Sequence, residues 1–255
     1  MRLHVVSDVH RRLDALAQAG DGADALVCLG DLLLFVDYDD HSQGIFSDLF
    51  GAEQASRYVA LRTAGAFDQA RELSARLWAE RGGDRSAHIE RAVRAQYEAI
   101  FAAMPQPAYL TYGNVDLPAM WAQFLRPGHH VVDGQRVQIG DLTFGFVGGG
   151  LRTRYRTPNE VSDEEYAAKV LAVGEVDVLC THIPPDLPEL SYDVAARRLE
   201  RGSSATLAAI RRTQPRLALF GHVHHPLAAR ARVGRTECVN VGYFRGSGRP
   251  FVLQW

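Results

Sequence analysis

Five short apolar runs in this sequence each end in a polar residue, and in three of them a glycine stands just before it. The runs are "LHVVS" (3–7), "DALVCLGD" (24–31), "PAYLTYGNVD" (107–116), "VDVLCTHIPP" (176–185) and "PRLALFGHVH" (215–224). Residues with helical apolar spacing separate several of them, at about 162–173 and 203–213. This alternation predicts an α/β fold, in which functional sites gather at the carboxyl ends of the strands. We therefore expect the polar ends of these runs to converge.

The remaining strand signals favour two sheets over one doubly wound sheet. "PLAARARVG" and "RTECVNVGYF" predict a hairpin that turns near Gly234, and "PFVLQW" predicts a last strand. The Asp133–Gly134 pair in "HHVVDGQRVQIG" predicts another hairpin, and the strand "LTFGFVGGG" follows it.

Residues 38–104 interrupt this plan. They begin with the polar and aromatic loop "YDDHSQGIFSDLFG", and helical apolar spacing follows it. The spaced residues are Phe67, Ala70, Leu73 and Leu77, and then Ile89, Val93, Tyr97, Ile100, Phe101 and Met104. We expect one domain over residues 1–255 with a helical insertion at about 38–104, which either packs on the sheet edge or caps the site.

Composition narrows the class of protein. A formal net charge of -2 and a pI of about 6.5 argue against bulk electrostatic binding of nucleic acid. Cys28, Cys180 and Cys238 lie inside apolar runs, which favours reduced thiols and a cytoplasmic location. "MRLHVVSDVH" indicates a strand rather than a signal peptide, and no apolar run reaches the length of a membrane span.

The polar residues at the strand ends form a set of carboxylate, amide and imidazole groups. The set is Asp8, His10, Asp31, Asn114, His182, His222 and His224. Each residue alone has an ordinary explanation, such as a helix cap, a left-handed turn or a hydrogen-bonded core histidine. Together they suit two adjacent Mn, Fe, Zn or Co ions. If these segments are extended, residues i and i+2 face the same way, as in the Asp8–His10 and His222–His224 pairs. A carboxylate such as Asp31 can bridge two ions, one through each oxygen.

The ordered motifs "DVH", "GDL", "GNVD", "TH" and "GHVH" resemble the calcineurin-like metallophosphoesterase superfamily. The resemblance implies a four-layer α-β-β-α sandwich with a dinuclear site, in which Asp31 bridges two ions that are Mn²⁺, Fe²⁺ or Fe³⁺, or Zn²⁺. It also implies the two remaining ligand sets, Asp8, His10 and His224 for one metal and Asn114, His182 and His222 for the other. A metal-bound hydroxide is then the nucleophile that attacks phosphorus.

One position departs from the family pattern. The family often has a histidine after Gly-Asn that protonates the leaving group, and this chain has Val115 there. Asp116, His41 or His225 is then the alternative proton donor, or the enzyme prefers good leaving groups. The expected catalytic residues are Asp31, Asn114, Asp116 and His225.

Arginines near the motifs are candidates for contact with the substrate. "GGGLRTRYRTP" (148–158) carries Arg152, Arg154 and Arg156, of which Arg154 is the candidate to clamp a phosphate oxygen, unless the loop is simply solvated. Arg12 follows His10 closely, and His41 follows the strand that delivers Asp31. Asn240, in "CVNVGYFR", is expected to support the metal loops.

The sequence therefore predicts a metal-dependent phosphoesterase, with a small-molecule or nucleotide phosphodiester as substrate in preference to a monoester. One alternative is a non-enzymatic scaffold of the same fold that binds a partner protein, which the intact ligand set disfavours. Another is a phosphomonoesterase or phosphoprotein phosphatase, which "GNVD" in place of "GNHE" disfavours.

Overall fold

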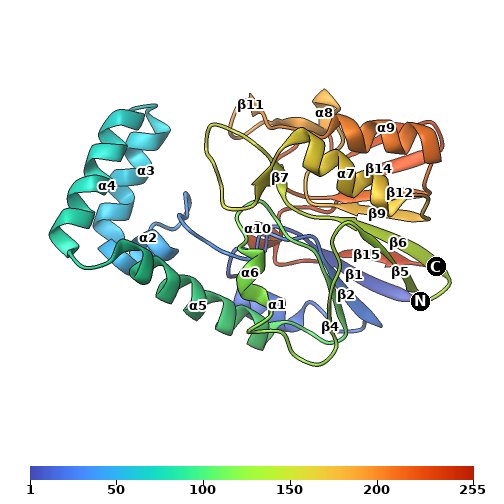
Figure 1. The fold of residues 1–255 in the computed structure, drawn as a ribbon, viewed down its shortest axis with the longest axis horizontal. Coiled ribbons are helices and arrows are strands. Elements are labelled where there is room, and N and C mark those ends of the chain that lie inside the picture. Colours follow the sequence, from blue (N-terminus) through green and yellow to red (C-terminus); the bar gives the residue numbers. More distant parts are fainter. The chain divides into compact units, whose positions relative to one another are not determined.

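The computed structural model describes residues 1–255 and divides them into two compact units. The first unit comprises residues 1–32 and 100–255, and the second comprises residues 33–99. Figure 1 shows the course of the chain through both.

The first sheet of the larger unit has the order β15-β1-β2-β3-β4. Its strands are β1 (Arg2–Val6), β2 (Ala25–Cys28), β3 (Ala108–Leu110), β4 (His129–Val131) and β15 (Phe251–Gln254). The strands β1 to β4 run parallel to one another, and only β15 is antiparallel to its neighbour. The carboxyl ends of β1, β2 and β3 therefore lie at one edge of this sheet.

The second sheet has the order β13-β14-β12-β9-β6-β5. Its strands are β5 (Gln135–Ile139), β6 (Leu142–Val147), β9 (Val178–Thr181), β12 (Leu217–Phe220), β13 (Arg230–Val233) and β14 (Thr236–Asn240). The four central strands are parallel, and the outer strands β5 and β13 each form a hairpin with a neighbour. The carboxyl ends of β9 and β12 thus also share an edge.

Alternating side chains give each sheet a core face. Val5, Val27, Phe146 and Leu219 are fully buried in the core between the two sheets. Side chains one position further along, such as Phe220, pack instead on the outer face of the second sheet. Helices α7 (Asp163–Val173) and α9 (Ser204–Thr213) cover that face (Figure 1). The two sheets and their flanking helices form the expected α-β-β-α sandwich.

Short elements connect these layers. They are α1 (Leu13–Gln18), α6 (Pro118–Trp121), β7 (Gly150–Leu151), β8 (Glu160–Val161), α8 (Pro188–Ser191), β10 (Tyr192–Asp193), β11 (Arg198–Leu199) and α10 (Phe244–Ser247). The strands β10 and β11 pair as a small hairpin, and β7 and β8 pair in parallel.

The smaller unit is helical. Its helices are α2 (Ile45–Phe50), α3 (Ala52–Thr63), α4 (Phe67–Arg81) and α5 (Arg85–Ala103), the last of which runs on into the larger unit. Phe46 stacks on Tyr58 and packs edge-on against Phe50, which in turn contacts Trp78. The rings of Phe46 and Phe50 thus pack against other aromatic rings of the smaller unit.

The predicted hairpin at Asp133–Gly134 is wrong. The strand before it, β4, belongs to the first sheet, and the strand after it, β5, belongs to the second. The Asp133 carboxylate accepts hydrogen bonds from Gly148 N and Lys169 Nζ, and Gly134 N donates to Phe146 O. These contacts fix a crossing between sheets, and the hairpin forms one step later, between β5 and β6.

None of the helices combines the length and the apolar character that a membrane crossing requires. The three cysteines are buried and form no disulfide.

Candidate metal centre

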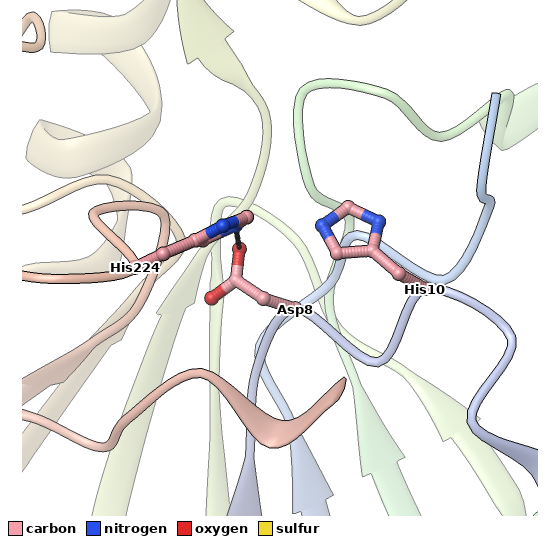
Figure 2. Close-up of side chains that lie close together, drawn as sticks. All are labelled: Asp8, His10 and His224. Atoms are coloured by element: carbon pink, nitrogen blue, oxygen red, sulfur yellow. Dashed lines mark ion pairs between the residues drawn. The ribbon is translucent and has the colours of Figure 1, made fainter. Parts of the chain in front are cut away.

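Two groups of potential metal ligands lie at the shared edge of the sheets. Asp8, His10 and His224 form the first group, in which the candidate ligand atoms are within 4.8 Å of one another. Figure 2 shows the His224 ring over the Asp8 carboxylate and the His10 ring to one side of both, with the His224–Asp8 ion pair drawn as a dashed line. His224 Nε2 lies 3.5 Å from Asp8 Oδ1.

Asp31, His182 and His222 form the second group, with the same spacing. The ligands come from the loops after β1, β2, β9 and β12, so five of the predicted strand ends, with that of β3 included, converge as the sequence indicated.

Asp31 connects the two groups through one oxygen. Its Oδ2 is 3.5 Å from His182 Nε2 and 4.0 Å from His10 Nε2. Its Oδ1 accepts a hydrogen bond of 2.9 Å from Val115 N. Oδ2 thus lies near a histidine of each group, and the expectation that each oxygen binds one metal stays a prediction.

The ligand loops are not extended, which corrects the reasoning from alternation. Asp8, His10, Asp31 and His222 all have φ between 40° and 66°, in the left-handed region. Such backbone is uncommon outside glycine and costs on the order of 1 kcal/mol or more per residue. Hydrogen bonds from Asp8 N to Gly30 O and from His10 N to Asp31 O hold the first two loops together. The ligands meet because the chain turns sharply after each strand.

Two of the motif glycines allow the ligand loops to approach closely. A Cβ at Gly113 would lie 1.9 Å from Asp31 Oδ1, and one at Gly221 would lie 2.5 Å from Asp8 Oδ2. Any side chain at either position would displace a carboxylate of the site. The Gly-Asn and Gly-His pairs are therefore requirements of packing around the ligands.

Hydrogen bonds orient the ligands of the second group. His182 Nδ1 lies 2.9 Å from Leu29 O, which leaves Nε2 directed at Asp31 and at Asn114 Oδ1, 2.9 Å away. The amide of Asn114 donates in turn to Thr157 Oγ1 at 3.0 Å. A histidine whose outer nitrogen bonds a backbone carbonyl is the usual arrangement in metal sites. Asn114, predicted as a ligand, thus stands beside the second group.

The charges of the site fit bound cations. Asp8 is buried, and its Oδ1 has no hydrogen-bond partner. Burial alone would raise the pKa of Asp8, but the neighbouring His224, His182 and His10 outweigh it and hold that pKa well below its usual range. Burial lowers the pKa of His182, yet Asp31 and Asp8 raise it to about 9. The buried carboxylates therefore need positive charge beside them, which metal ions would supply with neutral imidazoles as ligands.

Asp116 is fully buried behind the ligands rather than among them. Its Oδ2 accepts hydrogen bonds from Asp31 N and Gly113 N, at 2.9 and 2.8 Å, and its Oδ1 accepts one from Leu32 N at 3.0 Å. Burial and the charge of Asp31 raise the pKa of Asp116 to about 7. The carboxylate thus joins the loops that carry Asp31 and Asn114.

Tyr243 and Arg245 border the first group, and sequence reasoning missed both. The Tyr243 ring stacks on His224 with centroids 3.9 Å apart, and it meets His10 edge-on. Arg245 N donates to Asp8 O and its Nη1 donates to His10 O. Their only signal in the sequence is their position shortly after Asn240. Asn240 Nδ2 donates to Val223 O, between the histidines of the last loop.

The other candidate residues belong to neither group. Arg12 Nη1 donates to Arg245 O, which directs that guanidinium toward the C-terminal loop. His225 is exposed, and its ring lies edge-on to Tyr243 with centroids 6.1 Å apart. Arg154 is exposed and bonds the Tyr155 hydroxyl. His41 belongs to the helical unit, where its Nδ1 lies 2.9 Å from Ser56 Oγ.

Comparison with known proteins gives a consistent result. The family model described as "Calcineurin-like phosphoesterase" matches residues 1–226. One solved crystal structure is 15% identical with a TM-score of 0.61, and the match covers 99% of this chain and 98% of the other. The protein TT1561 of Thermus thermophilus is 13% identical with a TM-score of 0.53 and the same coverage. No curated protein sequence matches. At such identities the structural matches establish the fold alone.

Proposed function

This chain belongs to the calcineurin-like phosphoesterase family, which implies metal-dependent phosphoester hydrolysis, and from that premise we propose that it is a dinuclear phosphodiesterase. The observation that supports two metals is the position of Asp31 Oδ2, which faces a histidine of each ligand group. Asp8, His10 and His224 would hold one ion, and Asn114, His182 and His222 the other.

Bound at these two positions, divalent ions would supply the positive charge that polarises a phosphate and activates water. Hydrogen bonds within the chain hold the ligand side chains and their loops in position. Leu29 O and Val115 N fix the orientation of His182 and Asp31. Asn240 and Arg245 brace the loops of the other ligands from the C-terminal side.

The preference for diesters is tested with two chromogenic substrates. With Mn²⁺ supplied, we expect kcat/KM for bis-p-nitrophenyl phosphate to equal or exceed that for p-nitrophenyl phosphate. Both substrates release p-nitrophenolate, so the comparison does not depend on a proton donor at the Val115 position. A monoester kcat/KM that is about tenfold higher, or about 1.4 kcal/mol of discrimination, favours a phosphomonoesterase. Absence of hydrolysis of both substrates by protein that holds two metal equivalents favours the scaffold alternative.

A separate proposal concerns the proton that the leaving group takes up. Asp116 bonds three backbone N–H groups, so we propose that His225, which is exposed beside Tyr243, is the donor. His41 is the competing candidate, since it follows the strand that carries Asp31 in the sequence.

The two candidate donors are distinguished by how the loss of activity on substitution of each histidine depends on the leaving group. We expect His225→Ala to slow hydrolysis of a diester with an alkyl leaving group by about 10²–10⁴-fold, and to change p-nitrophenolate release little. His130→Ala, a change at another exposed histidine, is the control. If His41→Ala and not His225→Ala shows this dependence, the insertion supplies the donor. Equal losses on both leaving groups would exclude a proton-donor role.

A further inference from the structure

Two loops of the larger unit carry four exposed arginines, and two of these arginines contact Tyr155. We name Arg154, Arg156, Arg197 and Arg198, together with Tyr155, the arginine rim. The first loop follows β7, and the second is the turn of the β10–β11 hairpin with the start of β11. All four arginines are exposed. The rim thus combines side chains from positions more than 40 residues apart in the sequence.

Tyr155 holds two of these arginines in fixed positions. The guanidinium carbons of Arg154 and Arg198 lie 5.1 and 5.0 Å from the centroid of its ring. Its hydroxyl accepts hydrogen bonds from Arg154 Nη2 at 3.0 Å and from Arg198 Nη1 at 2.6 Å. A guanidinium held at an aromatic ring loses less side-chain freedom when it binds an anion.

The rim adjoins the metal centre through both of its loops. Thr157, two residues after Tyr155, accepts the hydrogen bond from the amide of Asn114. Two residues span roughly 7 Å at most, so Tyr155 starts close to the second ligand group. On the other loop, Arg198 is paired with Asp193, whose carboxylate accepts the N–H of His225, next to His224.

The positive charge of the rim is only partly compensated. Arg198 Nε donates to Glu200 Oε1 at 2.6 Å, while its Nη2 has no hydrogen-bond partner. Arg156 and Arg197 form no ion pair and have φ of 51° and 53°, in the left-handed region. The nearby Arg152 and Arg201, by contrast, pair with Glu165 and Asp163. The positive charge of Arg156 and Arg197 beside a phosphoesterase centre favours an anionic ligand.

We propose that the arginine rim binds a second phosphate group of the substrate, which lies several bonds away from the phosphorus that is attacked. The substrate class is then a phosphodiester that carries a further phosphate, such as a phosphorylated nucleotide diester. This inference rests on the proposed phosphodiesterase function and adds a specificity site to it.

The test compares two substrates that differ by one phosphate. They are thymidine 5′-p-nitrophenyl phosphate and the same compound with a 3′-phosphate. For the unmodified enzyme we expect kcat/KM to be at least about tenfold higher for the 3′-phosphorylated compound, which a single charge-assisted contact can supply. Arg156→Ala and Arg198→Ala should each remove most of that preference, with bis-p-nitrophenyl phosphate hydrolysis and the melting temperature unchanged.

The matched control is Arg235→Ala, an exposed arginine in the turn between β13 and β14, near the start of β12 and so at the opposite edge of the sheet. It should keep the full preference. Equal kcat/KM for the two thymidine compounds, or a preference that both rim variants retain, would overturn the proposal. If no diester is hydrolysed, the proposed function fails, and the rim is judged by the relative Kd of thymidine 3′,5′-bisphosphate and thymidine 5′-monophosphate in the same variants.

Discussion

Replacement of Asp31 with asparagine is expected to release metal and to reduce phosphodiester hydrolysis by more than about 100-fold. Loss of a residue that only supports a ligand typically costs about 10–100-fold, and Asp31 is expected to touch both ions. The amide keeps the shape of the side chain and can still accept the Val115 N–H bond, so the loop should remain in place. What disappears is the negative charge on the oxygen that faces His10 and His182.

Metal content by mass spectrometry, after dialysis against a weak chelator, is the primary measurement, and circular dichroism checks the fold. Asp141→Asn, the same substitution in an exposed turn between β5 and β6, is the control and should behave as the parent. Retention of two metal equivalents and parental turnover by the Asp31 variant would contradict the bridging role.

The convergence of the site could be predicted from the sequence because it depends on topology. Parallel strands deliver their carboxyl ends to one edge, so polar residues after five apolar runs were bound to approach one another. The precise geometry could not be predicted this way. The alternation argument for Asp8–His10 and His222–His224 assumed extended chain, whereas three of these four residues are left-handed. These side chains do lie close together, but because of sharp turns and not because the chain is extended.

The parts that escaped prediction depend on contacts between residues far apart in the sequence. The Asp133–Gly134 pair has the chemistry of a tight turn, but its carboxylate bonds Lys169, 36 residues away, and the chain crosses to the other sheet. Arg245 reaches His10 across 235 residues, and Tyr243 stacks on His224. No local pattern marks such residues, since a tyrosine and an arginine after a strand are equally common on a solvated surface.

The surroundings of Asp116 suggest a second role for it besides the predicted one of proton donor. From the sequence it was a candidate proton donor, because it follows the Val115 position closely. In the fold its carboxylate is the only side chain that joins the backbone of Asp31, Leu32 and Gly113. We therefore propose that Asp116 is a positioning residue that keeps the Asp31 and Asn114 loops together, and this role predicts a loss of stability as well as of activity.

Asp116→Ala is expected to lower the free energy of unfolding by about 3 kcal/mol, because it leaves three buried N–H groups without an acceptor at about 1–3 kcal/mol each, which need not add fully. Urea denaturation of the metal-free protein measures this loss apart from metal binding. Asp24→Ala, which removes one exposed carboxylate that accepts only Arg2 N, is the control and should cost less than about 1 kcal/mol.

Asp116→Asn separates the two roles, since its amide oxygen can keep the Oδ2 bonds to Asp31 N and Gly113 N. If Asp116 is a positioning residue, the Asp116→Asn protein should keep its metals and most of its turnover with every leaving group. A stable, metal-loaded Asp116→Asn protein that fails only on poor leaving groups would instead return Asp116 to the role of proton donor.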